Sequence, residues 1–261
     1  MALSTRPPPA HDCSEMAATT ASVRERPGPI PELSRARHGN ALRAGVLGST
    51  DGLVSNLCLV MGVAGSGAPH EAIVVAGFAG LVAGSLSMAL GEYLSVQSSR
   101  ELLANELRIE AVQLAASPDA EVAELRGIYE RKGVPARMAA ELAEHMVLSD
   151  PVLALDTMAR EELGFDPHEL GGSAWVAGGT SLVLFAIGAL VPLLPFLMLN
   201  GQAALIAAAG LSAIAVFGLG AGITRLTGIH PLRSGLRQLA FGASAAVVTY
   251  GIGVLVGTAI R

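Results

Sequence analysis

Five stretches of the chain are apolar over the length that crosses a lipid bilayer. About 20 apolar residues in helical conformation are needed to span ~30 Å of hydrocarbon. The five stretches cover residues 44–64, 72–96, 172–194, 203–223 and 239–260. This pattern predicts an all-α, polytopic membrane protein with five transmembrane helices and the lipid bilayer as a partner.

The residues between the second and third stretches have a different composition. Residues 97–169 contain fifteen of the 22 acidic residues and seven of the 17 basic ones, and apolar residues recur among them at helical spacing. Proline-containing turns near Pro118, Pro135 and Pro151 divide this region. We therefore expect three or four amphipathic helices outside the bilayer.

The predicted organisation has four parts. Residues 1–40 are rich in Pro, Arg, Ser and Glu and lack apolar periodicity, which is typical of a disordered tail. Residues 41–96 contain the first two transmembrane helices, and residues 97–170 form the acidic helical segment. Residues 171–261 contain the last three transmembrane helices.

The positions of the basic residues predict how the chain crosses the membrane. Six precede residue 44, seven lie in the acidic segment and three lie between the fourth and fifth spans, all on one side of a five-span arrangement. Basic residues concentrate on the cytoplasmic side, so the N-terminus and the acidic segment are expected in the cytoplasm. Lys132 is the single lysine among the 17 basic residues. This bias fits a GC-rich genome and favours a bacterial plasma (inner) membrane.

The composition supports these predictions and argues against other classes. The mean hydropathy is +0.52 and only 15% of the residues are charged. The net charge is −5, so there is no basic excess that would indicate a nucleic-acid partner. A Gly-rich phosphate loop with its lysine is absent from the sequence, and no Ser/His/Asp or Cys/His arrangement stands out. We therefore expect no enzymatic activity and no prosthetic group.

Asp51 is the first candidate for a functional residue. It is the one ionisable residue in the first apolar stretch. A carboxylate in mid-membrane costs roughly 2.5–3.5 kcal/mol on insertion scales, so such residues usually face a pore, a partner helix or a cation. The structural alternative is a hydrogen bond to a neighbouring hydroxyl or amide, such as that of Ser49, Thr50, Ser55 or Asn56.

Met88 and Glu92 in the second stretch are the next candidates for an ion path. They are four residues apart and share a helical face. A thioether beside carboxylates suits a transition metal better than Ca²⁺ or Mg²⁺, which prefer oxygen ligands. From spacing alone, however, a methionine in a span is better explained as packing or lipid-facing.

The acidic segment repeats carboxylates at helical spacing, which could bind divalent cations. For any single pair, a solvated helix face is the better explanation; the signal is the repetition. The predicted metal ligands of this segment are Glu106, Glu110, Glu121, Glu124, Met158, Glu161 and Glu162.

Four motifs resemble those of a known family. They are residues 38–55 (HGNALRAGVLGSTDGLVS), 83–95 (AGSLSMALGEYLS), 158–164 (MAREELG) and 191–196 (VPLLPF). In this order, with five spans and an acidic insert, the sequence resembles the vacuolar iron transporter family, the iron and manganese transporters of plants, fungi and bacteria.

The resemblance implies a homodimer whose ion path lies between the subunits and is lined by Asp51 and Met88. It also implies export of Fe²⁺ or Mn²⁺ from the cytosol in exchange for protons, with the metal as substrate. The positions that match the family's cytoplasmic metal-collecting residues are Glu110, Glu121, Glu124, Glu162 and Met158.

Three positions depart from the family pattern. Gly80 stands where plant members carry a second pore glutamate, and Gln113 and Ala159 stand where they carry cytoplasmic glutamates. The sequence leaves two other functions open, a metal-gated channel or sensor and a membrane-anchored ferroxidase or metal store. The store is disfavoured because a di-iron site expects Glu-x-x-His pairs, whereas Glu141 and His145 are four residues apart.

Overall fold

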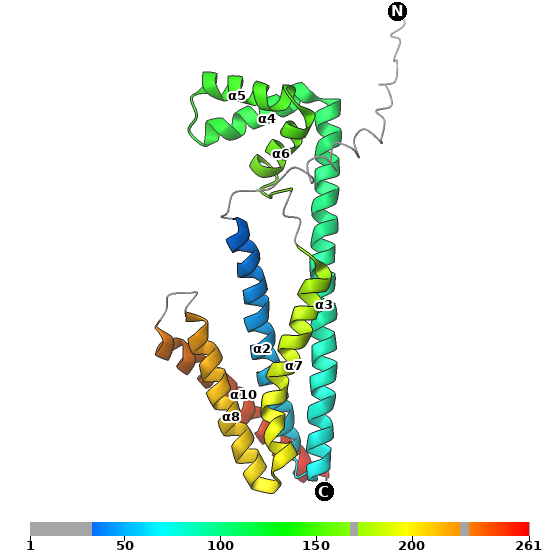
Figure 1. The fold of residues 1–261 in the computed structure, drawn as a ribbon, viewed down its shortest axis with the longest axis vertical. Helices are drawn as coiled ribbons and strands as arrows, with labels where there is room; N and C mark the ends of the chain where they lie inside the picture. Colours follow the sequence, from blue (N-terminus) through cyan, green and yellow to red (C-terminus); the bar gives the residue numbers. More distant parts are fainter. Residues whose placement is uncertain (1–32, 168–171, 225–229, 261) are drawn as a thin grey trace, which may run out of the picture. The chain divides into compact units, whose positions relative to one another are not determined.

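Eight α-helices and no strand are found in the residues that the structure describes. These residues are 33–167, 172–224 and 230–260 of a computed structural model (Figure 1). The helices are α2 (Leu33–Gly65), α3 (His70–Ala116), α4 (Pro118–Arg131), α5 (Ala136–Leu148), α6 (Pro151–Glu161), α7 (Ala174–Met198), α8 (Gly201–Gly222) and α10 (Pro231–Ile260). The predicted all-α class is therefore confirmed.

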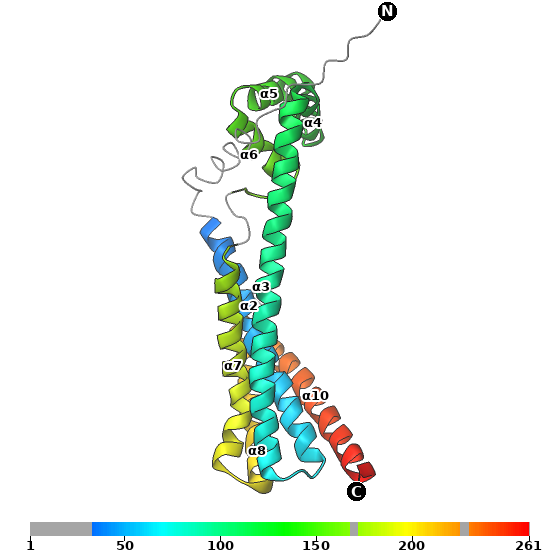
Figure 2. The same cartoon turned by 90° about the vertical axis from the view of Figure 1, so that its right-hand side faces the viewer.

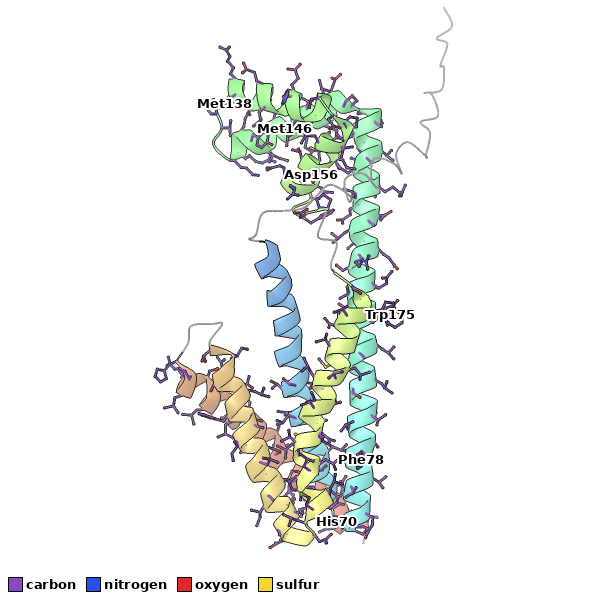
Figure 3. All side chains as sticks on the ribbon, viewed as in Figure 1. His70, Phe78, Met138, Met146, Asp156 and Trp175 are labelled. Carbon is purple, nitrogen blue, oxygen red and sulfur yellow. The ribbon has the colours of Figure 1, made fainter. Side chains whose placement is uncertain are left out.

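Five of these helices are long and apolar enough to cross a membrane. They are α2, α3, α7, α8 and α10, which correspond to the five predicted spans. Large apolar side chains lie exposed on their outer surfaces, among them Phe78 and Trp175, which project outward (Figure 3). A lipid-facing surface is apolar in this way, since hydrocarbon offers no partner to polar groups.

The chain divides into two compact units, and helix α3 contributes to both. The first unit contains residues 96–172, and the second contains residues 32–95 and 173–261. We call them the helical unit and the bundle unit. Most of the predicted disordered tail lies outside the described residues, and α2 already begins at Leu33.

Helix α3 continues without a break past the predicted end of the second span. It has 47 residues, which at 1.5 Å per residue corresponds to about 70 Å, more than twice the ~30 Å of hydrocarbon. Neither Gly nor Pro occurs between Gly91 and Ser117 to interrupt it. The predicted boundary near residue 96 is therefore a change of composition within one helix.

In the bundle unit, α2 packs against α7, α8 and α10, and α8 also contacts α7 and α10 (Figure 2). The crossing of α2 and α7 depends on two glycines. A Cβ atom on Gly52 would overlap the Phe185 carbonyl, and one on Gly188 would overlap the Ser49 carbonyl. Small residues permit such backbone contact between membrane helices, and here they fix α2 against α7 beside Asp51.

In the helical unit, α4, α5 and α6 pack around a buried apolar core. Two helix starts occur where the sequence predicts them. Ser117 is the residue before α4, with Pro118 at the first helical position. Asp150 precedes α6, and its carboxylate accepts a hydrogen bond from the Val152 N–H at 2.9 Å. Proline fits this first position because its missing N–H would have no helical partner there.

Candidate functional site

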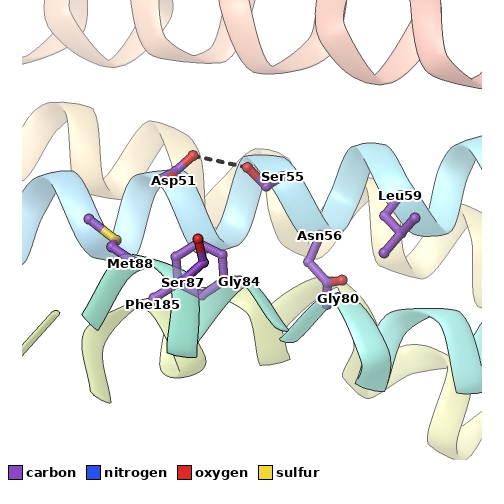
Figure 4. Close-up of a pocket in the computed structure, with 9 residues that line it drawn as sticks. All are labelled: Asp51, Ser55, Asn56, Leu59, Gly80, Gly84, Ser87, Met88 and Phe185. Carbon is purple, nitrogen blue, oxygen red and sulfur yellow. Dashed lines mark hydrogen bonds between the residues drawn. The ribbon is translucent and has the colours of Figure 1, made fainter. Parts of the chain in front are cut away.

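The bundle unit contains a pocket of about 330 Å³ between α2, α3 and α7 (Figure 4). Its lining combines one carboxylate, one amide, one thioether and two hydroxyls with apolar groups. The lining residues are Asp51, Ser55, Asn56, Leu59, Gly80, Gly84, Ser87, Met88 and Phe185.

Asp51 lies on an exposed part of α2, and its carboxylate accepts a hydrogen bond from the Ser55 hydroxyl at 2.9 Å (Figure 4). The hydrogen bond expected under the structural explanation is therefore present. It does not bury the carboxylate, however, because Asp51 remains exposed and lines the pocket. The acidic group stays accessible to a cation.

Met88 lies on α3 beside α2. A Cβ atom on Gly48 would be 3.7 Å from the Met88 sulfur, so the thioether packs directly against the α2 backbone. The structure thus brings Asp51 and Met88 to one pocket. Glu92 is half-buried one turn further along α3 and does not line this pocket, so its place in the ion path stays a prediction.

Asn56 is a pocket residue that the sequence analysis considered only as a hydrogen-bond partner of Asp51. Its side chain is 2% exposed, and its Nδ2 donates a hydrogen bond to the Ala189 carbonyl on α7 at 2.6 Å. The available signal was the same one that pointed to Asp51, a polar side chain within a membrane span.

The helical unit contains a cluster of three carboxylates. Glu110 on α3, Glu121 on α4 and Glu162 after α6 place carboxylate oxygens within 4.8 Å of one another. Glu110 is 2% exposed and Glu121 is 5% exposed. One oxygen each of Glu110 and Glu162 is buried without a hydrogen-bond partner. Three converging oxygen ligands suit a divalent cation.

Burial and mutual repulsion destabilise the ionised forms of these acids. Burial and the charges of Glu162, Glu121 and Glu124 raise the pKa of Glu110 to about 7. Burial is also the main cause that raises the pKa values of Glu121 and Glu162, and the charge of Glu124 adds to both. A bound cation would offset this penalty, because an opposite charge stabilises carboxylates.

The other predicted ligands of the helical unit are not in this cluster, although Glu124 acts on it through its charge. Glu161 forms an ion pair with Lys132. Met158 is fully buried in the apolar core with Leu125 and Tyr129. Glu106 is half-buried. In the described part of the chain, the three clustered glutamates are the one group of three or more His, Cys, Asp or Glu side chains with ligand atoms this close.

The sequence pattern of the VIT family matches residues 42–254. The chain belongs to the VIT family. Its relatives include vacuolar iron transporter 1 of Oryza sativa subsp. japonica, 32% identical, with 84% of this chain and 87% of that protein covered. Vacuolar iron transporter 1 of Arabidopsis thaliana is 30% identical, with 81% and 84% covered. A vacuolar iron transporter of Acanthamoeba castellanii is 34% identical, with 82% and 78% covered.

The three positions that depart from the expected family pattern have different surroundings in the structure of this VIT family member. Gly80 lines the pocket in the bundle unit. Gln113 is exposed on α3. Ala159 is fully buried against Leu107 and Leu155, where a carboxylate would have to enter an apolar core. Only Gly80 therefore bears directly on the pocket that holds Asp51.

Proposed function

We propose that this protein is a secondary transporter that exports divalent iron and/or manganese from the cytosol in exchange for protons. The observation that carries the proposal is a pocket between membrane-length helices in which an Asp51 carboxylate and a Met88 thioether occur together. The carboxylate supplies negative charge for a cation, and the thioether favours a transition metal over Ca²⁺ or Mg²⁺. The names of the relatives support iron as the cargo.

We further propose a homodimer with the ion path between the two subunits. Asp51 lies in a membrane-length stretch of α2 and is nevertheless exposed in the single chain. A carboxylate facing lipid would be costly. A second copy of the chain that covers the Asp51 side of α2 would turn this exposed face into the wall of an ion path.

The glutamate cluster of the helical unit has a separate role in this proposal. Glu110, Glu121 and Glu162 bind the metal on the cytoplasmic side and raise its local concentration before transport. Basic residues are concentrated in the N-terminal region and in the acidic segment, and this distribution supports a cytoplasmic location for both parts of the chain. Lys132 is the single lysine among the 17 basic residues, a bias that fits a GC-rich genome, and on this ground the protein resides in a bacterial plasma membrane.

The test is uptake of Fe²⁺ and Mn²⁺ into proteoliposomes, with and without a pH gradient. Wild-type protein should show gradient-dependent uptake, and Asp51→Ala should abolish it while the protein remains folded. Glu141→Ala is the matched control, because Glu141 is an exposed carboxylate on α5, paired with Arg137. Normal uptake by Asp51→Ala would refute the mechanism.

A metal-gated channel or sensor is the second candidate function. The observation in its favour is that the glutamate cluster is complete within the helical unit and uses no residue of the pocket. The same experiment separates the two functions. Metal flux that is indifferent to the pH gradient, and that depends on the clustered glutamates, would favour the channel.

A further inference from the structure

We propose that the Asn56 amide oxygen is a ligand of the transported divalent cation, and that glycine at position 80 leaves room for the cation to reach this oxygen once the Leu59 side chain moves aside. This inference rests on the proposed function, because it assigns a second binding position within the same pocket. The residue that would provide this second position, Asn56, carries no charge.

The first observation is the fixed orientation of the Asn56 amide. Its Nδ2 donates to the Ala189 carbonyl at 2.6 Å. Only the NH₂ group of an asparagine can donate to a carbonyl, so the positions of nitrogen and oxygen in this amide are determined. The contact anchors the nitrogen on α7, and the oxygen is directed elsewhere.

The second observation is that the oxygen has no partner. Asn56 Oδ1 is buried and accepts no hydrogen bond, and the whole residue is 2% exposed. Buried polar atoms are nearly always satisfied, and an exception calls for an explanation. Because Asn56 lines the pocket, a cation that enters it would supply the missing partner.

The third observation is the position of Gly80 opposite this oxygen. A Cβ atom at position 80 would lie 2.8 Å from Asn56 Oδ1 and would overlap the end of the Leu59 side chain. Figure 4 shows the Asn56 oxygen directed toward α3 at Gly80. The end of the Leu59 side chain occupies the space next to the oxygen, and any side chain at position 80 would compete for the same space.

Together these contacts give the pocket two ends. Near one end, Asp51 lies on α2 and Met88 on α3; near the other, Asn56 lies on α2 and Gly80 on α3 (Figure 4). Asp51 and Asn56 are five residues apart, about 7.5 Å along a helix axis. A cation held by the carboxylate and thioether could pass to a neutral amide oxygen, which binds it without a second negative charge.

The test compares two glycine substitutions on the same helix. Gly80→Ala leaves the Asn56 side chain intact and places a methyl group at its oxygen, while Leu59 is flexible enough to move aside. Gly91→Ala is the matched control, because a Cβ atom there meets nothing within 4 Å. We expect Gly80→Ala to lower Mn²⁺ uptake at low Mn²⁺ severalfold, and Gly91→Ala to leave it unchanged.

Asn56→Leu removes the oxygen from a side chain of similar size. We expect uptake at low Mn²⁺ to fall by about tenfold or more, the range in which metal affinity responds to lost supporting groups. Ser212→Ala controls for removal of a buried, unpartnered oxygen elsewhere in the bundle. Size-exclusion chromatography reports whether each variant is folded. If Asn56→Leu does not fold, the comparison of Gly80→Ala with Gly91→Ala tests the assignment of Asn56.

The outcomes separate this inference from the proposed function. If wild-type uptake depends on Asp51 but is unchanged in Gly80→Ala and in folded Asn56→Leu, the Asn56 assignment is wrong and the transporter proposal stands.

If wild-type protein transports neither metal, the transporter proposal fails. In that case Mn²⁺ bound per chain is counted by electron paramagnetic resonance in a Glu121→Gln/Glu162→Gln background. Loss of one ion on Gly80→Ala would support the site, and an unchanged count would overturn it.

Discussion

The pocket and the glutamate cluster bring polar groups together in opposite ways. The cluster joins three carboxylates, two of them almost fully buried, and their pKa values are raised. The pocket holds one exposed carboxylate among neutral oxygens and a thioether. Concentrated charge favours tight capture of a cation, whereas a single charge with neutral ligands favours its passage and release. The two sites thus suit two different steps.

The largest expected effect follows from removing the single charge of the pocket. Asp51→Asn keeps the size of the side chain but leaves no carboxylate. We expect Mn²⁺ uptake to fall to background, while Mn²⁺ bound at the glutamate cluster is unchanged. Uptake into proteoliposomes and equilibrium binding to the purified protein measure the two quantities. Loss of both together would show that the sites are not independent.

A smaller effect is expected from the double substitution Glu121→Gln/Glu162→Gln. It removes two of the three clustered charges and should lower the number of tightly bound Mn²⁺ ions by one per chain. Uptake should require severalfold more Mn²⁺ to reach half of its maximal rate, while the maximal rate remains. A lower maximal rate at saturating Mn²⁺ would instead place the cluster in the transport step.

The pH dependence of the cluster is the next prediction. The pKa of Glu110 is raised from 4.5 to about 7, so metal-free protein retains a proton there that the unfolded chain releases. The contribution of Glu110 to the stability of the protein is therefore largest below the unfolded pKa and is lost as the pH rises from about 4.5 through 7. Thermal unfolding of metal-free protein should show this decrease, and Glu110→Gln should remove most of it.

Metal binding at the cluster should show the opposite pH dependence. A cation binds the deprotonated carboxylates, so Mn²⁺ affinity should rise severalfold between pH 6 and pH 8, with release of protons. Calorimetric titration in buffers of different ionisation enthalpy counts these protons. An affinity independent of pH would mean that Glu110 is not a ligand.

The smallest effect is expected at the ion pair between Lys132 and Glu161. Lys132 is more than half exposed, and exposed pairs contribute about 1 kcal/mol or less. Lys132→Ala should therefore change the free energy of unfolding by no more than this. If Glu161 is also a metal ligand, as the sequence predicts, its release from Lys132 should tighten Mn²⁺ binding; an unchanged affinity would argue against that assignment.

Particular residues show where sequence reasoning succeeded in the two sites. Asp51 stood out because a charge in an apolar stretch is rare, and this signal is visible from composition alone. Glu110, Glu121 and Glu162 were among the predicted ligands, but helical spacing places only Glu106, four residues away, on the same face as Glu110. The structure instead joins Glu110 to carboxylates from two other segments. Spacing within one helix cannot reveal contacts between helices.

The sequence by itself determined the helical class and the five membrane-length helices, because hydropathy is a local property that adds up along the chain. It also determined which residue types were available to bind a metal. Only the tertiary structure decided which of them meet. The Gly52 and Gly188 contacts set α2 against α7, the Ala189 carbonyl orients Asn56, and the Asn56 oxygen lies against Gly80. The contacts of Gly52, Gly188 and the Asn56 nitrogen join residues more than a hundred positions apart in the chain, and the Gly80 contact joins two different helices; packing alone brings these atoms together.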